Sequence, residues 1–127
     1  MKEPKHFLIV EDSESQVYYE KLILNLLGAN VDVAKSLKET KEKLVMNGYD
    51  FILLDLGLPD SKGKNTLKRV REMTNDKIVV MTGTDNEKLK KYAIKVNVHE
   101  YIVKGDIEME VFEDMVDNNN DGGENKE

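Results

Sequence analysis

The sequence predicts an α/β domain in which a five-stranded parallel sheet is covered by helices on both faces. Short apolar, β-prone segments alternate five times with segments of helical spacing, which is typical of a parallel sheet. The segments at 51–54 and 77–81 are almost continuously apolar, as expected for strands buried on both faces. Right-handed crossovers would then place helices on both sides of the sheet. The 127 residues suffice for one such domain with its own core.

Each predicted strand is a short apolar run that ends in turn or polar residues. The five strands are expected at residues 6–10, 30–35, 51–54, 77–81 and 100–103. The second has an alternating pattern and belongs nearer the edge of the sheet. The third leads directly into Asp55, and because Pro59 cannot continue a central strand, the chain leaves the sheet just after Asp55.

The helices are predicted from the spacing of apolar residues and from capping signals. They are expected over residues 13–27, 36–47, 63–73, 84–96 and from about 106 to 116. Ser13, Ser36 and Thr84 each precede a Gln or Glu three residues later, which is the capping-box pattern of a helix start. Gly28 and Gly48 supply stop signals after the first two helices.

Composition excludes several classes of protein. The net charge of −6 and the pI near 5.0 disfavour direct binding to nucleic acid or to an anionic membrane. The absence of Cys excludes disulfides and thiolate metal sites. Since no apolar stretch is long enough for a signal peptide or a membrane span, a cytoplasmic protein is expected. Residues 118–127 contain only Asn, Asp, Gly, Glu and Lys and are predicted to be a disordered tail after a domain over 1–117.

Polar and charged side chains gather where the predicted strands end. They are Glu11, Asp12, Asp55, Thr82 and Lys104. Because the carboxyl ends of parallel strands meet at one edge of the sheet, the three carboxylates should converge and repel unless a cation neutralises them. Mg²⁺ is usually held by one or two carboxylates together with water and a substrate phosphate, and an aspartate can itself be phosphorylated. Asp is also common in turns, but five such groups at four strand ends favour a phosphoryl-transfer site.

The same residues resemble the receiver domain of two-component response regulators, over about residues 5–116. The segments that carry the resemblance are Glu11-Asp12, Asp55–Pro59 with Gly63, Thr82-Gly83 and Tyr101–Lys104. The resemblance implies a flavodoxin-like, doubly wound (βα)5 fold with strand order 2-1-3-4-5, similar to the chemotaxis regulators. It also implies that Asp55 accepts a phosphoryl group from a phosphohistidine of a histidine kinase or phosphotransfer protein. Mg²⁺ would be held by Glu11, Asp12, Asp55 and the backbone carbonyl of Gly57.

The resemblance assigns roles to the remaining residues of the site. Lys104 would contact the phosphoryl group, Thr82 would move to meet it, and Tyr101 would swing between outward and inward positions. Gly57 and Thr84 would tune the rate of phosphate loss. Such a domain assists its own phosphorylation and dephosphorylation, but its product is a signal, so it is not expected to be an enzyme.

Three positions depart from the usual pattern of the family. Gly105 follows Lys104 where a Pro with a cis bond is usual, and a cis bond before Gly would cost about 2.5–4 kcal/mol. Asn97 stands where Gly is common, and Asn tolerates the positive φ that this turn requires. Gly57 has no side chain, so it cannot position an attacking water.

The predicted helix at 84–96 is basic and the last helix is acidic. The charged residues are Lys88, Lys90, Lys91 and Lys95 on the former, and Glu108, Glu110, Glu113 and Asp114 on the latter. They form either two solvated faces or, with the strand at 100–103, a surface for an output partner or a second copy. Two other functions stay open, namely an interaction module that is not phosphorylated and a Mg²⁺-dependent phosphohydrolase.

Overall fold

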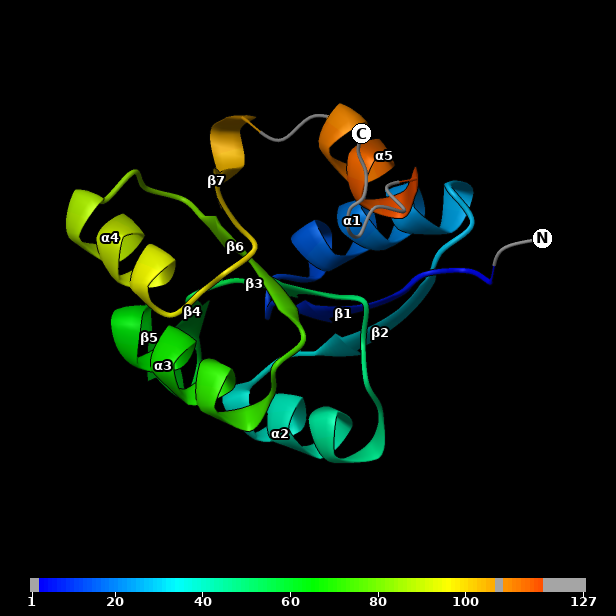
Figure 1. The fold of residues 1–127 in the computed structure, drawn as a ribbon. Coiled ribbons are helices and arrows are strands. Elements are labelled where there is room, and N and C mark those ends of the chain that lie inside the picture. Colours follow the sequence, from blue (N-terminus) through cyan, green and yellow to red (C-terminus); the bar gives the residue numbers. More distant parts are fainter. Residues whose placement is uncertain (1–2, 107–108, 118–127) are drawn as a thin grey trace, which may run out of the picture.

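The computed structural model describes residues 3–106 and 109–117 and contains the predicted parallel sheet (Figure 1). Its strands are β1 (His6–Val10), β2 (Asn30–Ala34), β3 (Phe51–Leu54), β6 (Lys77–Thr82) and β7 (Glu100–Val103). They are ordered β2-β1-β3-β6-β7, and every neighbouring pair is parallel. The predicted strand order 2-1-3-4-5 and the flavodoxin-like architecture are therefore confirmed.

Helices cover both faces of this sheet. They are α1 (Glu14–Leu26), α2 (Leu37–Met46), α3 (Gly63–Met73), α4 (Glu87–Lys95) and α5 (Met109–Asp117). Figure 1 shows α1 beside α5 on one face and α2, α3 and α4 in a row on the other. Doubly wound sheets of this kind bind their ligands at the carboxyl ends of the strands.

The two faces of the sheet have separate apolar cores. Phe7 and Leu53 pack with α1 and α5, whereas Leu8 and Leu54 pack with the helices of the other face. Successive residues of a strand point to opposite faces, so a strand with helices on both sides needs an apolar residue at every position. This requirement explains the continuous apolar run at Phe51–Leu54, in which no residue is more than 3% exposed.

Two of the three predicted helix caps are confirmed and one is wrong. The hydroxyl oxygens of Ser13 and Ser36 accept the backbone N–H groups of Gln16 and Glu39 at 3.4 and 3.0 Å. Thr84, however, does not cap α4. The N-cap lies two residues later, at Asn86, whose side chain accepts the backbone N–H of Leu89 at 3.0 Å.

The last predicted helix is described from Met109 onward. Lys104–Asp106 form a single 3₁₀ turn, and α5 covers Met109–Asp117, while residues 107–108 between them lie outside the described residues. Glu108 and the predicted tail at 118–127 therefore also fall outside the described part of the chain. No cis peptide bond occurs among the described residues, so the bond before Gly105 is trans, and Asn97 has the expected positive φ of 60°.

A small hairpin follows β3 that the sequence patterns did not indicate. Its strands are β4 (Gly57–Leu58) and β5 (Ser61–Lys62), which pair antiparallel around Pro59 and Asp60. The Asp60 carboxylate accepts the N–H groups of Leu37 and Lys38, the first two residues of α2, at 2.8 and 3.1 Å. These backbone hydrogen bonds lower the pKa of Asp60. The hairpin after Asp55 is thus fastened to the start of a neighbouring helix.

Among the described helices, none combines the length and the apolar character that crossing a bilayer requires.

Candidate functional site

The three predicted metal-binding carboxylates lie together at the ends of β1 and β3. One ligand oxygen from each of Glu11, Asp12 and Asp55 lies within 4.8 Å of the others. The sheet ladder continues to these residues, because the backbone N–H of Glu11 donates to Ala34 at 3.0 Å and that of Asp55 donates to Val10 at 2.9 Å. Glu11 is 3% exposed, Asp55 is half-buried and Asp12 is exposed. The backbone therefore fixes a cluster of carboxylates that solvent can reach from one side.

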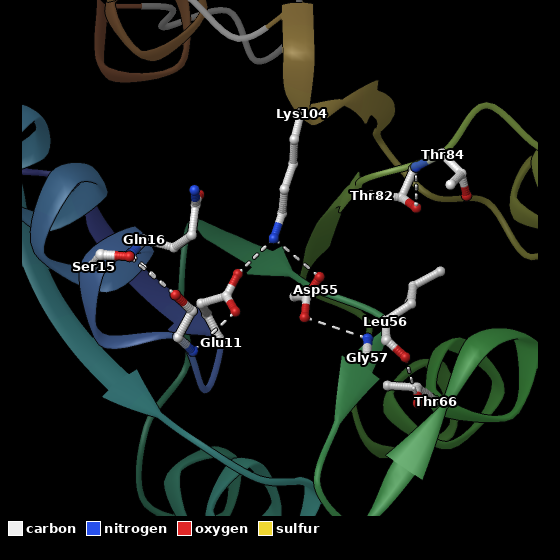
Figure 2. A network of polar contacts seen from close by, with 11 residues as sticks. Glu11, Ser15, Gln16, Asp55, Leu56, Gly57, Thr66, Thr82, Thr84 and Lys104 are labelled. Atoms are coloured by element: carbon white, nitrogen blue, oxygen red, sulfur yellow. Dashed lines mark hydrogen bonds and ion pairs between the residues drawn. The ribbon is translucent and has the colours of Figure 1, made fainter.

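Lys104 reaches this cluster from the end of β7 (Figure 2). Its Nζ lies 2.7 Å from Oε1 of Glu11 and 3.2 Å from Oδ1 of Asp55. One ammonium opposes the three carboxylates, which leaves a formal charge of −2 when all four groups are ionised. A hard divalent cation with oxygen ligands matches both this charge and the available donors.

The pKa of Asp55 is set by its burial and by the charged groups around it. Burial raises the pKa of Asp55, and the charge of Glu11 raises it further, while Lys104 and the N–H of Gly57 partly offset the rise. Burial alone would lower the pKa of Lys104, but its hydrogen bond to Glu11 and the charges of the two carboxylates outweigh burial and raise it. Because metal binding requires ionised carboxylates, cation binding and proton release from Asp55 should be linked.

Gly57 faces the acceptor carboxylate. Its backbone N–H donates to Oδ2 of Asp55 at 3.3 Å, and a Cβ placed on Gly57 would lie 3.8 Å from the same oxygen. A side chain at this position would therefore stand beside the acceptor. The role of Gly57 in phosphate loss stays a prediction.

Thr82, the last residue of β6, and Thr84 lie on the side of Asp55 away from Glu11 in Figure 2. The Thr82 hydroxyl accepts the backbone N–H of Thr84 at 3.3 Å, and no hydrogen bond joins Thr82 to Asp55 within the described part of the chain. Thr82 is buried and Thr84 is exposed. Thr82 is therefore close to the site in the fold but bonded to its own loop.

Tyr101 packs against the apolar core between the sheet and α4, and its hydroxyl is buried. Within residues 3–106 and 109–117 this hydroxyl has no hydrogen-bond partner. A buried hydroxyl without a partner costs about 1–3 kcal/mol.

Replacing Tyr101 with Phe should therefore raise the free energy of unfolding of the unphosphorylated protein by about 1 kcal/mol. Urea unfolding measures the change. The matched control is Tyr49→Phe, because the Tyr49 hydroxyl donates to Oδ2 of Asp32 at 2.7 Å and its loss should destabilise by about 1 kcal/mol. Destabilisation by Tyr101→Phe would show that the hydroxyl is satisfied in solution.

Sequence patterns missed one acidic residue near the site. Glu20 lies on the inward side of α1, is 3% exposed, and lines a cavity of about 420 Å³ together with Lys104. Burial raises the pKa of Glu20 to about 7, with smaller contributions from the charges of Glu11 and Asp55. Its spacing of three residues from Val17 and four from Leu24 is the signal that would have placed it on the buried face.

The family model that describes the response regulator receiver domain matches residues 7–117. The chain is 33% identical over 97 residues to the response regulator ArlR of Staphylococcus saprophyticus, in a match that covers 76% of this chain and 44% of that protein. It is 31% identical over 99 residues to the sensory transduction protein LytR of Staphylococcus epidermidis, covering 76% and 39%. The matches thus span less than half the length of these relatives.

Solved structures of similar fold include further regulators. A two-component response regulator from Clostridium difficile has a TM-score of 0.77 at 26% identity, covering 84% of this chain and 88% of that one. A response regulator from Burkholderia pseudomallei, with a phosphorylated aspartic acid, a calcium ion and citrate, has a TM-score of 0.78 at 22% identity, covering 91% and 68%. At 22% identity, the similarity to the Burkholderia pseudomallei structure establishes the fold alone.

Proposed function

The chain belongs to the response regulator receiver family, and from this premise we propose that Asp55 accepts a phosphoryl group from a phosphohistidine. The donor would be a histidine kinase or a histidine phosphotransfer protein. The observation that carries the proposal is the meeting of Glu11, Asp12 and Asp55 within 4.8 Å, with Lys104 in contact with two of them. Receiver domains are signalling domains, and the product here would be a phosphorylated surface that a partner recognises.

The donor set fits Mg²⁺, which would be held by Glu11, Asp12, Asp55 and the carbonyl of Gly57. Bound there, the ion would offset negative charge on the transferring phosphoryl group. An oxygen of the Asp55 carboxylate would form a bond to phosphorus as the bond between phosphorus and the histidine nitrogen breaks, and the electron pair would return to the imidazole. Lys104 would hold a phosphoryl oxygen, since its ammonium already touches Asp55 at 3.2 Å.

A phosphoryl group on Asp55 would give the neighbouring Thr82 hydroxyl a new hydrogen-bond acceptor. Thr82 now accepts a hydrogen bond from Thr84, but its own proton can be donated to a phosphoryl oxygen on Asp55. Movement of Thr82 would alter the loop between β6 and α4, and Tyr101 packs against the same apolar cluster as α4. We propose that phosphorylation in this way shifts the surface formed by α4, β7 and α5.

Two other functions are weighed against this one. An interaction module without phosphorylation would not need the four contacting groups Glu11, Asp12, Asp55 and Lys104. A Mg²⁺-dependent phosphohydrolase would need a substrate pocket at the acceptor, and Asp55 is not among the residues that line the cavity beside Lys104. Family membership favours the receiver function over both.

Incubation with Mg²⁺ and acetyl phosphate distinguishes the three functions. We expect one phosphoryl group per chain, stable to acid and labile to base, on Asp55, with no label in Asp55→Asn or in EDTA. Absence of label on the folded wild-type protein would favour the interaction module. Repeated release of phosphate with many turnovers would favour the phosphohydrolase.

The α4-β7-α5 surface carries complementary charge. Lys88, Lys91 and Lys95 are exposed on α4, and Glu110, Glu113 and Asp114 are exposed on α5. An antiparallel second copy or an output partner could pair with these charges. In addition, Ile94 of α4 is 69% exposed and lies on the same helix.

Charge reversal by Lys91→Glu with Lys95→Glu should weaken association of the phosphorylated form by about tenfold or more. Analytical ultracentrifugation before and after acetyl phosphate treatment measures self-association. Reversal of two exposed lysines on another helix, Lys38→Glu with Lys41→Glu on α2, should have little effect. Equal association of all three proteins, or no association at all, would remove self-association through this surface.

A further inference from the structure

Behind the phosphorylation site lies a buried pair of hydroxyl groups. The Oγ1 of Thr66 is 2.8 Å from the Oγ of Ser61 and 3.3 Å from the carbonyl oxygen of Leu56. Thr66 is fully buried and Ser61 is 8% exposed. Burying hydroxyl groups is costly unless they are hydrogen-bonded, and an apolar pair would fill the same space without that requirement. The pair therefore needs an explanation beyond packing.

The carbonyl of Leu56 connects this pair to the acceptor. Leu56 C=O and Gly57 N–H belong to one planar peptide group, so fixing the carbonyl fixes the direction of the N–H. The carbonyl accepts the N–H of Gly63 at 2.7 Å and is contacted by Thr66. On the opposite side the N–H donates to Oδ2 of Asp55 at 3.3 Å. Figure 2 shows Thr66 and Asp55 on the two sides of this peptide.

The Thr66 hydroxyl is the donor in both contacts. Its single proton is shared between the Oγ of Ser61 at 2.8 Å and the carbonyl oxygen of Leu56 at 3.3 Å. The contact with Ser61 holds the Thr66 hydroxyl beside this carbonyl. Donation to the carbonyl polarises the peptide and strengthens the N–H of Gly57 as a donor.

We propose that the Ser61–Thr66 hydroxyl pair holds the Leu56–Gly57 peptide with its N–H directed at Asp55, which makes Thr66 a positioning residue for phosphoryl acceptance. The inference rests on the proposed function, because its consequence is a faster reaction at Asp55. An N–H held in place donates to charge that develops on the acceptor or on a phosphoryl oxygen without reorganisation during the reaction. Thr66 itself touches neither the acceptor nor the incoming group.

The variants that test this inference separate the hydroxyl from packing. Thr66→Val removes the hydroxyl at nearly constant shape, and Thr66→Ser keeps it. The double variant Ser61→Ala with Thr66→Val removes both partners, which leaves no unsatisfied hydroxyl and should be nearly neutral for stability. Thr40→Val is the matched control, because Thr40 is equally buried but its hydroxyl donates to the Ser36 carbonyl at the start of α2, at 2.8 Å.

Two measurements are made on each folded variant, the rate of labelling by acetyl phosphate at saturating Mg²⁺ and the hydrogen exchange of the Gly57 amide. Thr66→Val and the double variant should label about five- to tenfold more slowly, and their Gly57 amide should exchange faster by a similar factor. Thr66→Ser should stay within about twofold of wild type in both measurements, as should Thr40→Val. If Thr66→Val does not fold, the double variant and Ser61→Ala carry the test.

The outcomes distinguish this inference from the function on which it rests. Wild-type labelling with an unchanged rate and unchanged Gly57 exchange in the double variant would overturn the positioning role and leave the receiver function intact. Equal slowing in Thr40→Val would also overturn it, since the effect would then be general destabilisation. A wild-type protein that is never labelled would overturn the receiver function and with it a role for Thr66 in phosphoryl acceptance.

Discussion

Replacing Glu20 with Gln is expected to raise the free energy of unfolding by about 3 kcal/mol at pH 8 and to leave it almost unchanged at pH 4.5. The reason is that Glu20 is 3% exposed and its pKa is raised from 4.5 to about 7. Burial is the largest cause, and the carboxylates of Glu11 and Asp55 add to it. An amide of the same shape has no charged form that the interior disfavours.

The direction of this pH dependence follows from whether Glu20 ionises first in the folded or in the unfolded state. Below pH 4.5 Glu20 is protonated in both states, and the stability contributed by its protonated form is fully present. As the pH rises through 4.5 the unfolded chain loses its proton before the folded one, so that stability is lost progressively up to about pH 7. The wild type should therefore become less stable than Glu20→Gln across this window.

Urea unfolding in EDTA at several pH values between 4.5 and 8 measures the difference, since EDTA keeps metal ions from the neighbouring carboxylates. The control Glu42→Gln removes an exposed carboxylate from α2 and should give a curve parallel to wild type. A constant offset between Glu20→Gln and wild type at all pH values would contradict the raised pKa. Such a result would mean that Glu20 is solvated or is paired with a cation in solution.

Most of the fold could be predicted because the signals that define it are local. The strands and the starts of the first two helices are marked by apolar runs and by Ser13 and Ser36. The prediction that α4 starts at Thr84 was wrong because Thr84 and Asn86 are both good N-cap residues. Their tertiary surroundings decide which of the two caps the helix. Thr82 holds the N–H of Thr84 in a turn, which leaves Asn86 to cap the helix. The β4–β5 hairpin has two residues in each strand, too few for any periodic pattern.

The residues of the site that directly follow a strand could be predicted from the sequence. Glu11 and Asp55 follow the neighbouring strands β1 and β3, and Lys104 follows β7, whose carboxyl end lies at the same edge of the sheet. Their convergence is therefore a consequence of topology. Glu20 and Thr66 were missed because they are polar residues at inward helical positions, whose partners lie on other elements. Helical spacing identifies such positions as buried, but the contacts that compensate a buried polar group depend on tertiary packing.

Replacing Lys104 with Met is expected to destabilise the metal-free protein by about 2–4 kcal/mol and to tighten Mg²⁺ binding. The ammonium lies 2.7 Å from Glu11 and 3.2 Å from Asp55, whose side chains are 4% and 15% exposed. Its removal leaves these carboxylates without the ammonium that contacts both of them, and they repel one another. A dication would then regain the interaction without displacing the ammonium, so Mg²⁺ should restore more stability to this variant than to wild type.

Thermal or urea unfolding with EDTA and with saturating Mg²⁺ measures both effects, and calorimetric titration gives the affinity. Lys35→Met is the matched control, because Lys35 contacts Glu14 at 3.7 Å in an exposed pair and its loss should cost less than about 1 kcal/mol. If Lys104→Met bound Mg²⁺ more weakly than wild type, the ammonium would be helping to shape the cation site. Lys104 and a dication would then not compete for the same carboxylate oxygens. Competition between two cations requires that removing one strengthens the binding of the other.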